Sequence, residues 1–450
     1  MFSLTFLISN KSLARQVLII FVLLALGCQE GFAQRTNRAR RERVERSPQQ
    51  TLVYEDKNYL PVIRTVQFHP NEEETGLPVY FLGEQGGLTL SFDDLRGDVR
   101  NYYYSIEHCS ANWQSSGLSA LEYSAGYNED RITDFTSSVN TQQAYTHYRM
   151  TLPSGQVKPT RSGNYLLKIY EDADKKRLII TRKFYVVQPL FDLQIQRVPS
   201  PNQGLRESNQ KLNLVVGTAG YQITNPYEQI QVVAMQNGRS DIQELLKRPS
   251  FVGNAEIRYE NPSSLDFQGG NEFRKVDIRS FNLLSEQVVR TYQDSLRNFE
   301  LIADEDLSGR AYGNLYDENG AFFIRNDDRL NALEEADYAW VHFQLKNKTM
   351  AADQAAQLDV YVVGAFNQFQ RSDENKLTFH PTTNEWSAKI LLKQGLYDYE
   401  YTAVNRESKQ VFPSRFAGNY YQTENTYQVF VYFRKPGTTW DEIWAFKEAR

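Results

Sequence analysis

The sequence predicts an all-β protein made of tandem β-sandwich domains. Apolar residues recur at every second position in many short segments, as they do in strands that bury one face. Residues that form tight turns separate these segments. The chain of 450 residues also contains 28 Tyr and 26 Phe, which favour pleated, half-buried surfaces.

The alternation is clearest in six segments spread over the chain: 88–92, 166–169, 229–234, 340–345, 397–401 and 428–433. Turn signals such as Gly86-Gly87, Asn237-Gly238 and Asn319-Gly320 lie beside or between them. Short strands connected in this way are typical of antiparallel sandwiches. Residues 240–247 form the one segment for which we expect a helix.

The length and composition predict three domains after an N-terminal leader. At roughly 100–200 residues per domain, the chain can form two to four domains. A strand pattern at 182–187 ends before Pro189, and a loop containing Pro and Gly follows at 199–204. Residues 347–357 are polar and lack alternation. We therefore expect sandwiches at 51–190, 191–347 and 348–450.

Residues 1–33 are predicted to be an export signal peptide. Two basic residues precede an apolar run at 17–27, which is too short to span a bilayer. The small residues Gly31 and Ala33 favour cleavage before residue 34. A second possibility is a loose lipobox that ends at Cys28, which would then carry a lipid.

Residues 34–50 form an Arg-rich segment that we interpret as a solvated linker. Residues 1–50 contain 8 of the 50 basic and 3 of the 55 acidic side chains, so the remainder has a net charge of 42 − 52 = −10. An acidic body argues against nucleic acid as a partner. With no other long apolar segment, we expect contact with a membrane only peripherally, through a partner.

No segment has the residues of a catalytic site. Glu107-His108-Cys109 places a thiol beside an imidazole, but neighbouring residues of a strand point to opposite faces. Asp93 and Asp94 are separated in the same way. We therefore expect no catalytic residue and no enzymatic activity.

We also expect no metal and no cofactor. The five histidines are scattered, and none has a second ligand at the spacing of a metal site. Residues 304–309 resemble the start of a calcium loop, but its twelfth position is Leu315 instead of a bidentate Glu.

One strand face is predicted to bind a partner protein. Tyr145, His147 and Arg149 alternate along the chain, so they lie on the same face of a strand. An aromatic ring, an imidazole and a guanidinium together are typical of contact residues at protein interfaces. We expect these three side chains to be exposed together.

A series of motifs in residues 60–445 resembles one family of Bacteroidota proteins. They are Ile63-Arg64-Thr65-Val66-Gln67, Ser91-Phe92-Asp93-Asp94-Leu95, Tyr103-Tyr104-Ser105-Ile106-Glu107-His108-Cys109, Asn112-Trp113, Tyr145-Thr146-His147-Tyr148-Arg149, Ser162-Gly163-Asn164-Tyr165, Gln236-Asn237-Gly238-Arg239, Gly270-Asn271-Glu272-Phe273-Arg274, Ala336-Asp337-Tyr338, Gly418-Asn419-Tyr420 and Thr423-Glu424-Asn425 with Tyr427. The chain thereby resembles the plug protein of the type IX secretion system.

This resemblance implies a non-enzymatic periplasmic protein, peripherally associated with the outer membrane. It would bind the periplasmic opening of the type IX translocon barrel and seal that opening when no cargo is in transit.

The predicted third domain resembles the E-set sandwich that binds glycogen-like glucans, on residues 362–367, 386–388 and 395–399. The resemblance implies immunoglobulin-like or E-set domains, and glycan binding as an alternative function. Phe369 and Gln370 stand where those modules carry a Trp that stacks on the sugar.

Overall fold

The computed structural model describes residues 46–329 and 331–450 of the chain. Residues 49–450 form one compact unit, which contains all the strands and helices named below. The predicted signal peptide 1–33, the alternative at Cys28 and residues 34–45 of the predicted linker lie outside the described residues. The predicted all-β, multi-domain sandwich fold is confirmed.

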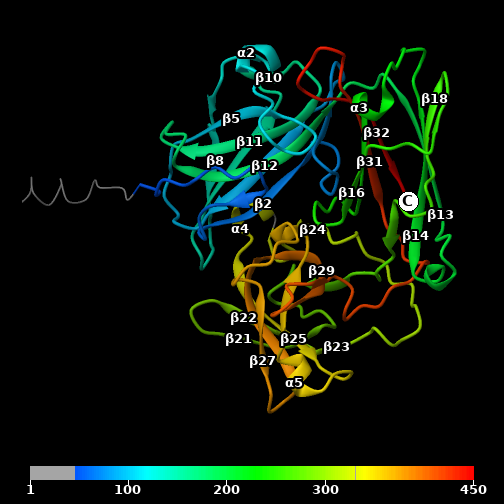
Figure 1. The fold of residues 1–450 in the computed structure, drawn as a ribbon. Helices are drawn as coiled ribbons and strands as arrows, with labels where there is room; N and C mark the ends of the chain where they lie inside the picture. Colours follow the sequence, from blue (N-terminus) through cyan, green and yellow to red (C-terminus); the bar gives the residue numbers. More distant parts are fainter. Residues whose placement is uncertain (1–45, 330) are drawn as a thin grey trace, which may run out of the picture. The chain divides into compact units, whose positions relative to one another are not determined.

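The first domain is a sandwich of two mainly antiparallel sheets, in which only β3 runs parallel to its neighbour within the domain (Figure 1). One sheet contains, in order, β2 (Ile63–Pro70), β4 (Leu88–Asp94), β9 (Thr146–Leu152) and β8 (Asp134–Ser137). The other contains β12 (Leu178–Val187), β11 (Gly163–Glu171), β5 (Tyr102–Cys109) and β7 (Asp130–Arg131), with β1 (Lys57–Asn58) and β3 (Val79–Phe81) also paired to β12. A small pair, β6 (Ser124–Gly126) and β10 (Val157–Pro159), follows the short helix α2 (Ala120–Tyr123). Apolar side chains from both sheets, including Leu90, Phe92 and Leu167, form the core.

The middle domain is a second sandwich. One sheet contains β13 (Asp192–Pro199), β14 (Asn209–Gly217), β18 (Glu256–Tyr259) and β17 (Phe251–Val252), with β19 (Asp266–Gln268) on β14. The other contains β16 (Gln243–Leu246), β15 (Ile230–Gln236), β31 (Tyr427–Phe433) and β32 (Glu442–Ala449). Single turns form η1 (Gln203–Leu205) and α3 (Pro226–Gln229). The helix expected at 240–247 is wrong, because β16 pairs antiparallel with β15 there.

The third domain lies between the strands of the middle domain in the sequence. Its strands run in the order β20 (Arg274–Asp277), β29 (Gly395–Asn405), β26 (Leu358–Val363), β27 (Lys376–His380), β28 (Glu385–Lys393), β25 (Tyr338–Lys346), β22 (Arg297–Leu301) and β21 (Val288–Gln293). Shorter pieces complete it: β23 (Asp304–Glu305), β24 (Phe322–Ile324), β30 (Val411–Phe412), α4 (Ala332–Glu335), α5 (Ala352–Ala355) and η2 (Ala365–Asn367). A single apolar cluster from Val276 to Phe416 forms its core.

The structure differs from the expected boundary between residues 347 and 348. β25 ends at Lys346, yet it pairs along its whole length with β28, so both sides of that boundary share one sheet and one core. The last strands, β31 and β32, return to the middle domain, where β31 pairs with β15. Figure 1 shows them in red among the green strands of that domain. The third domain is therefore an insertion, and residues 347–357 form a loop and α5 within it.

The first and middle domains share a sheet. β12 of the first domain runs parallel to β32 and pairs with it at Val187 and Ile443, which joins the two half-sheets into one. A separate apolar cluster covers this junction and contains residues of both domains. Within it the rings of Tyr185 and Phe430 stack with centroids 4.1 Å apart. The joint between these domains is therefore built like the interior of a single domain.

Candidate functional site

Asp93 is the centre of a buried polar cluster between the first and third domains. Its Oδ1 lies 2.7 Å from Nδ1 of His147, which is on the neighbouring strand β9. Its Oδ2 accepts hydrogen bonds from two groups of the third domain, Nζ of Lys393 at 2.7 Å and the hydroxyl of Tyr338 at 2.7 Å. The Asp93 and Lys393 side chains are almost completely inaccessible to solvent.

The charges of this cluster depend on one another. Burial opposes ionisation of Asp93, but the Lys393 ammonium and the His147 ring outweigh it and hold the pKa of Asp93 below its ordinary value. Burial lowers the pKa of Lys393, and the Asp93 carboxylate counters part of that effect. A buried ion pair adds little net stability, but removing one partner leaves a charge buried without compensation. Loss of either Asp93 or Lys393 should therefore weaken the contact between the two domains.

Two of the three predicted contact residues belong to this interface. Tyr145 is only 1% exposed; its hydroxyl donates to the carbonyls of Leu333 and Ala336, and the Lys393 ammonium lies 3.9 Å from the centre of its ring. His147 is 7% exposed. The expectation that Tyr145 and His147 are exposed is therefore wrong, because the third domain covers them. Arg149 is exposed, as expected.

Further polar contacts between the first and third domains lie around the buried cluster. The Asp337 carboxylate accepts hydrogen bonds from the backbone N–H groups of Gln142, at 2.6 Å, and Gln143, at 3.1 Å. Nearer the surface, Arg64 pairs with Glu374 at 2.7 Å, and Arg325 pairs with Glu74 at 2.6 Å. Directional bonds therefore hold the third domain to the first.

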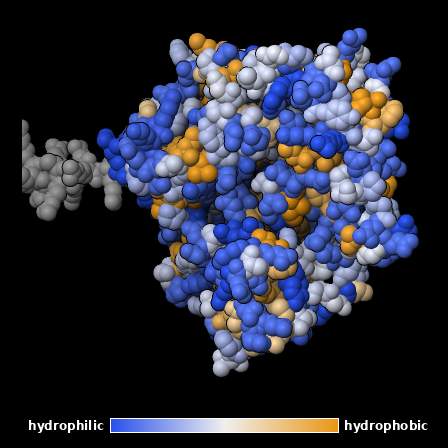
Figure 2. Space-filling view, viewed as in Figure 1, coloured by the Kyte–Doolittle hydropathy of each residue, from blue (hydrophilic) through white to orange (hydrophobic). Residues whose placement is uncertain are grey.

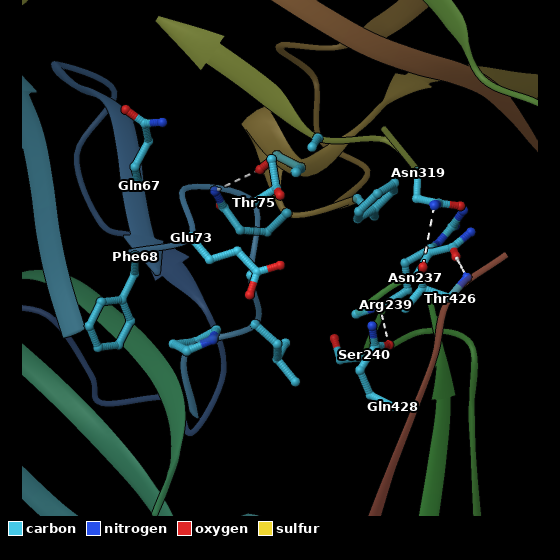
Figure 3. Close-up of a pocket in the computed structure, with 18 of the residues that line it drawn as sticks. Gln67, Phe68, Glu73, Thr75, Asn237, Arg239, Ser240, Asn319, Thr426 and Gln428 are labelled. Carbon is cyan, nitrogen blue, oxygen red and sulfur yellow. Dashed lines mark hydrogen bonds between the residues drawn. The ribbon is translucent and has the colours of Figure 1, made fainter. Parts of the chain in front are cut away.

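The three domains meet around a cavity of about 250 Å³. Figure 2 shows the surface hollowed between the domains, and Figure 3 shows Gln67, Phe68 and Glu73 on the opposite side of the cavity from Arg239 and Gln428. Its lining mixes basic, acidic, amide and aromatic side chains, without an excess of one kind. This composition gives no indication of a particular ligand.

Phe369, at the position where glucan-binding modules carry a stacking Trp, lies in the wall of this cavity. The ring is buried; the Arg239 guanidinium lies 4.4 Å from its centre, and Phe273 packs against it at 6.1 Å. Arg239 is in turn held by Asp241 and Glu400. The face on which a sugar would stack is therefore occupied by a residue of the middle domain.

Glu107, His108 and Cys109 have separate partners. The Glu107 carboxylate accepts a hydrogen bond from Lys168 at 2.7 Å. Burial lowers the pKa of His108 to about 4, and its Nε2 donates to the Ser162 carbonyl at 3.2 Å. Burial raises the pKa of the Cys109 thiol to about 12. The Cys109 thiol donates to the Glu107 carbonyl, with Sγ 3.7 Å from that oxygen, so the imidazole and the thiol bond to different groups.

The carboxylates of the acidic segment 304–309 form hydrogen bonds and an ion pair within the third domain. Asp304 accepts hydrogen bonds from the hydroxyls of Tyr399 and Tyr401, and pairs with Arg274 at 3.1 Å. Asp306 accepts from Thr349. Within residues 46–329 and 331–450, no group of three or more potential ligands is arranged to hold a metal ion. None of the helices described is both long and apolar enough to cross a membrane.

Sequence reasoning missed Lys393 and the docking roles of Asp93 and Asp337. Asp93 and Asp337 do stand in the motifs that carry the family resemblance, together with Tyr338. For Asp93 the sequence did contain a signal. It is a charged residue in a strand, β4, whose residues are all buried. Lys393 ends a strand that carries one other lysine, Lys389, and nothing in the sequence distinguishes the two.

The fold and this site define the class of the protein. It is a multi-domain β-sandwich protein in which polar contacts hold the first and third domains together. Residues 63–188 match the family model described as the Type 9 secretion system plug protein 1st domain. The family resemblance predicted from the sequence is thereby confirmed, and the match indicates a role in type IX secretion and a location in the periplasm or cell envelope.

One solved structure resembles the chain over most of its length. It is the crystal structure of a hypothetical protein from Parabacteroides merdae, which is 28% identical, covers 89% of this chain and 100% of its own, and superposes with a TM-score of 0.84. No curated protein matches the chain. The resemblance to an E-set module stays a prediction.

Proposed function

We propose that this protein is a plug of the type IX secretion translocon. It would bind the periplasmic opening of the outer-membrane barrel and close that opening when no cargo passes. The observation that carries the proposal is the match of residues 63–188 to the first domain of the plug protein. The protein would be periplasmic and peripherally associated with the outer membrane through the barrel.

The joints between the domains support this role. A cover over a wide pore must keep its shape, and the first and middle domains share one sheet and one apolar cluster. The side chains that we considered as catalytic or metal-binding candidates, such as His108, Cys109 and Asp304, are buried or bonded within the fold. We therefore propose that the protein acts by occupying a surface and is not an enzyme.

We propose that the docking surface lies on the first domain. Arg149 stays a candidate because it is exposed. The most exposed large apolar side chains of this domain are Leu121 in α2, at 82%, and Tyr127 between β6 and β7, at 67%. Exposed apolar and aromatic side chains are the usual anchors of an interface, and a reversible one buries about 1,200–2,000 Å² in total.

Glycan binding is less favoured. Stacking needs an open aromatic face, and Arg239 covers the ring of Phe369.

The experiment is a pull-down from cells with a tag after Arg450. We expect the wild-type chain to recover a very large outer-membrane barrel, and the double variant Leu121→Glu/Tyr127→Glu to lose it. The matched control is Leu283→Glu/Tyr227→Glu, which makes the same change at exposed positions of the other two domains. Failure of the wild-type chain to recover the barrel would defeat the plug function. Equal recovery by both variants would defeat only this docking surface.

A further inference from the structure

A groove of about 260 Å³ lies on the first domain beside the end of the last strand. Its floor is apolar and its rim is acidic. The floor consists of Leu77, Val79, Tyr80, Phe81 and Phe446, and the carboxylates that line it are Glu72, Glu73, Glu84 and Glu448. No Lys, Arg or His is among the described residues that line the groove.

The floor is a fixed part of the fold. Phe81 belongs to β3, which pairs with β12, and its ring lies 6.2 Å from that of Phe446 in β32. Phe446 packs in turn against Phe430, with centroids 4.7 Å apart, at the shared apolar cluster of the first and middle domains. The aromatic surface is therefore formed before any ligand binds, and its ordering does not oppose binding.

The four carboxylates of the rim are exposed, and within the described part of the chain none of them pairs with a basic side chain. Their neighbour Glu74 differs, because it pairs with Arg325 at 2.6 Å. Partial burial and the negative charge of Glu73 raise the pKa of Glu448, while a hydrogen bond from Gln428 and the positive charge of Arg450 act in the opposite direction. The lining of the groove therefore carries an excess of negative charge, and none of its carboxylates forms an ion pair in the described part of the chain.

We infer that this groove binds a basic, extended polypeptide segment of a partner protein. Arg or Lys side chains would lie over the aromatic floor and pair with the carboxylates of the rim, while apolar residues of the segment would contact Leu77 and Val79. The acidic rim selects the charge of the ligand, and aromatic faces attract the same cations. An Arg side chain suits both contacts, because its guanidinium is planar and pairs with carboxylates through two bonds. This inference does not depend on the plug function.

The test measures binding of a fluorescein-labelled peptide of alternating Arg and Leu to the full chain, by fluorescence anisotropy at low salt. We expect saturable binding that falls at least tenfold in the variant Glu73→Gln/Glu84→Gln/Glu448→Gln. The matched control, Glu207→Gln/Glu260→Gln/Glu407→Gln, removes the same charge from exposed sites elsewhere and should change the affinity less than twofold.

A second variant tests the floor. Phe446→Leu keeps an apolar side chain but removes the ring, so we expect about threefold weaker binding of the Arg–Leu peptide with the fold retained. Absence of saturable binding, or equal weakening by the rim and control variants, would overturn the inference. Binding of a peptide of alternating Glu and Leu as tight as that of the Arg–Leu peptide would also overturn it.

Discussion

The first domain is joined to its two neighbours in different ways. Its joint with the middle domain is a continuous sheet covered by apolar side chains, such as Tyr185, Val187 and Phe430. Its joint with the third domain is a set of hydrogen bonds and ion pairs around the buried carboxylate of Asp93.

Charged groups also bond at the first joint, where Arg161 pairs with Glu442 at 3.2 Å and Asp441 accepts a hydrogen bond from the backbone N–H of Ala111. The second joint differs because its central ion pair, Asp93 with Lys393, is almost completely inaccessible to solvent.

The difference indicates how each joint responds to change. Apolar contacts are non-directional and tolerate small shifts, so the apolar part of the first joint should depend little on salt. A buried ion pair must keep both partners and their geometry, so the second joint can be broken by a single substitution. The attachment of the third domain is therefore the joint that is more sensitive to the loss of a single charged side chain.

The largest effect is expected for Lys393→Met. This change leaves the Asp93 carboxylate buried without its cation and should lower the free energy of unfolding by about 3–5 kcal/mol. The double variant Asp93→Asn/Lys393→Met removes both charges and should recover most of the loss. Urea unfolding followed by tryptophan fluorescence measures both. A double variant as unstable as the single one would contradict the role given to the ion pair.

Substitution of Phe430 tests the apolar joint. Phe430→Ala removes the ring stacked on Tyr185 and should cost about 3–4 kcal/mol, as large cavities in a core do. Because no charge is involved, the loss should be the same in 0.1 M and 1 M sodium chloride, measured by the same urea titration. The control Phe430→Leu keeps most of the apolar volume and should cost clearly less than Phe430→Ala, about 1–2 kcal/mol. A loss that changes strongly with salt would erase the distinction between the two joints.

His108 lies close to the apolar joint and should make the first domain sensitive to acid. Burial lowers the pKa of His108 to about 4, below the value of about 6.5 in an unfolded chain. The unfolded state therefore binds the proton first as pH falls below 6.5, and stability declines down to about pH 4. The loss should reach about 3 kcal/mol at pH 4.

The control for this prediction is His108→Gln, which keeps a donor for the Ser162 carbonyl but does not titrate. Its stability should decline less between pH 6.5 and 4 than that of the wild-type chain. Parallel pH profiles for the two proteins, measured by urea unfolding, would show that the imidazole is not the group responsible.

The smallest effect is expected for Tyr145→Phe. The change removes a hydroxyl that donates to two carbonyls of the third domain and should cost about 1 kcal/mol. Tyr127→Phe, at an exposed position, is the matched control and should be neutral. Thermal midpoints of the two variants give the comparison. A cost for Tyr145→Phe no larger than that of the control would mean that this bond is replaced by water.

The sequence predicted the strands better than their partners. Alternation placed β4, β15, β25, β29 and β31 correctly, because each has a regular apolar face. It failed at β16, an edge strand in which half-exposed residues at Gln243–Leu246 lack such a face. It could not show that β31 pairs with β15, since that contact joins segments nearly two hundred residues apart. The insertion of the third domain was therefore missed.

The candidate site was predicted only in part, for the same reason. Alternation put Tyr145, His147 and Arg149 on one face, and Tyr148 points the other way into the core. What covers a face depends on the tertiary structure, and a polar face covered by another domain has the same pattern as one in water. The acidic groove could not be predicted either, because Glu73 and Glu448 come together only where β32 of the middle domain lies beside the first domain.

The most direct measurement of the proposed plug function is uptake of vancomycin, which an intact outer membrane excludes, by cells that lack this protein. If the protein closes the translocon at rest, deletion should raise vancomycin uptake, and expression of the wild-type chain should restore exclusion. A strain that carries Arg149→Glu tests the exposed candidate in the same assay, and raised uptake there would place Arg149 in the docking surface. Unchanged uptake in the deletion strain, with the translocon still present in its outer membrane, would contradict the proposal.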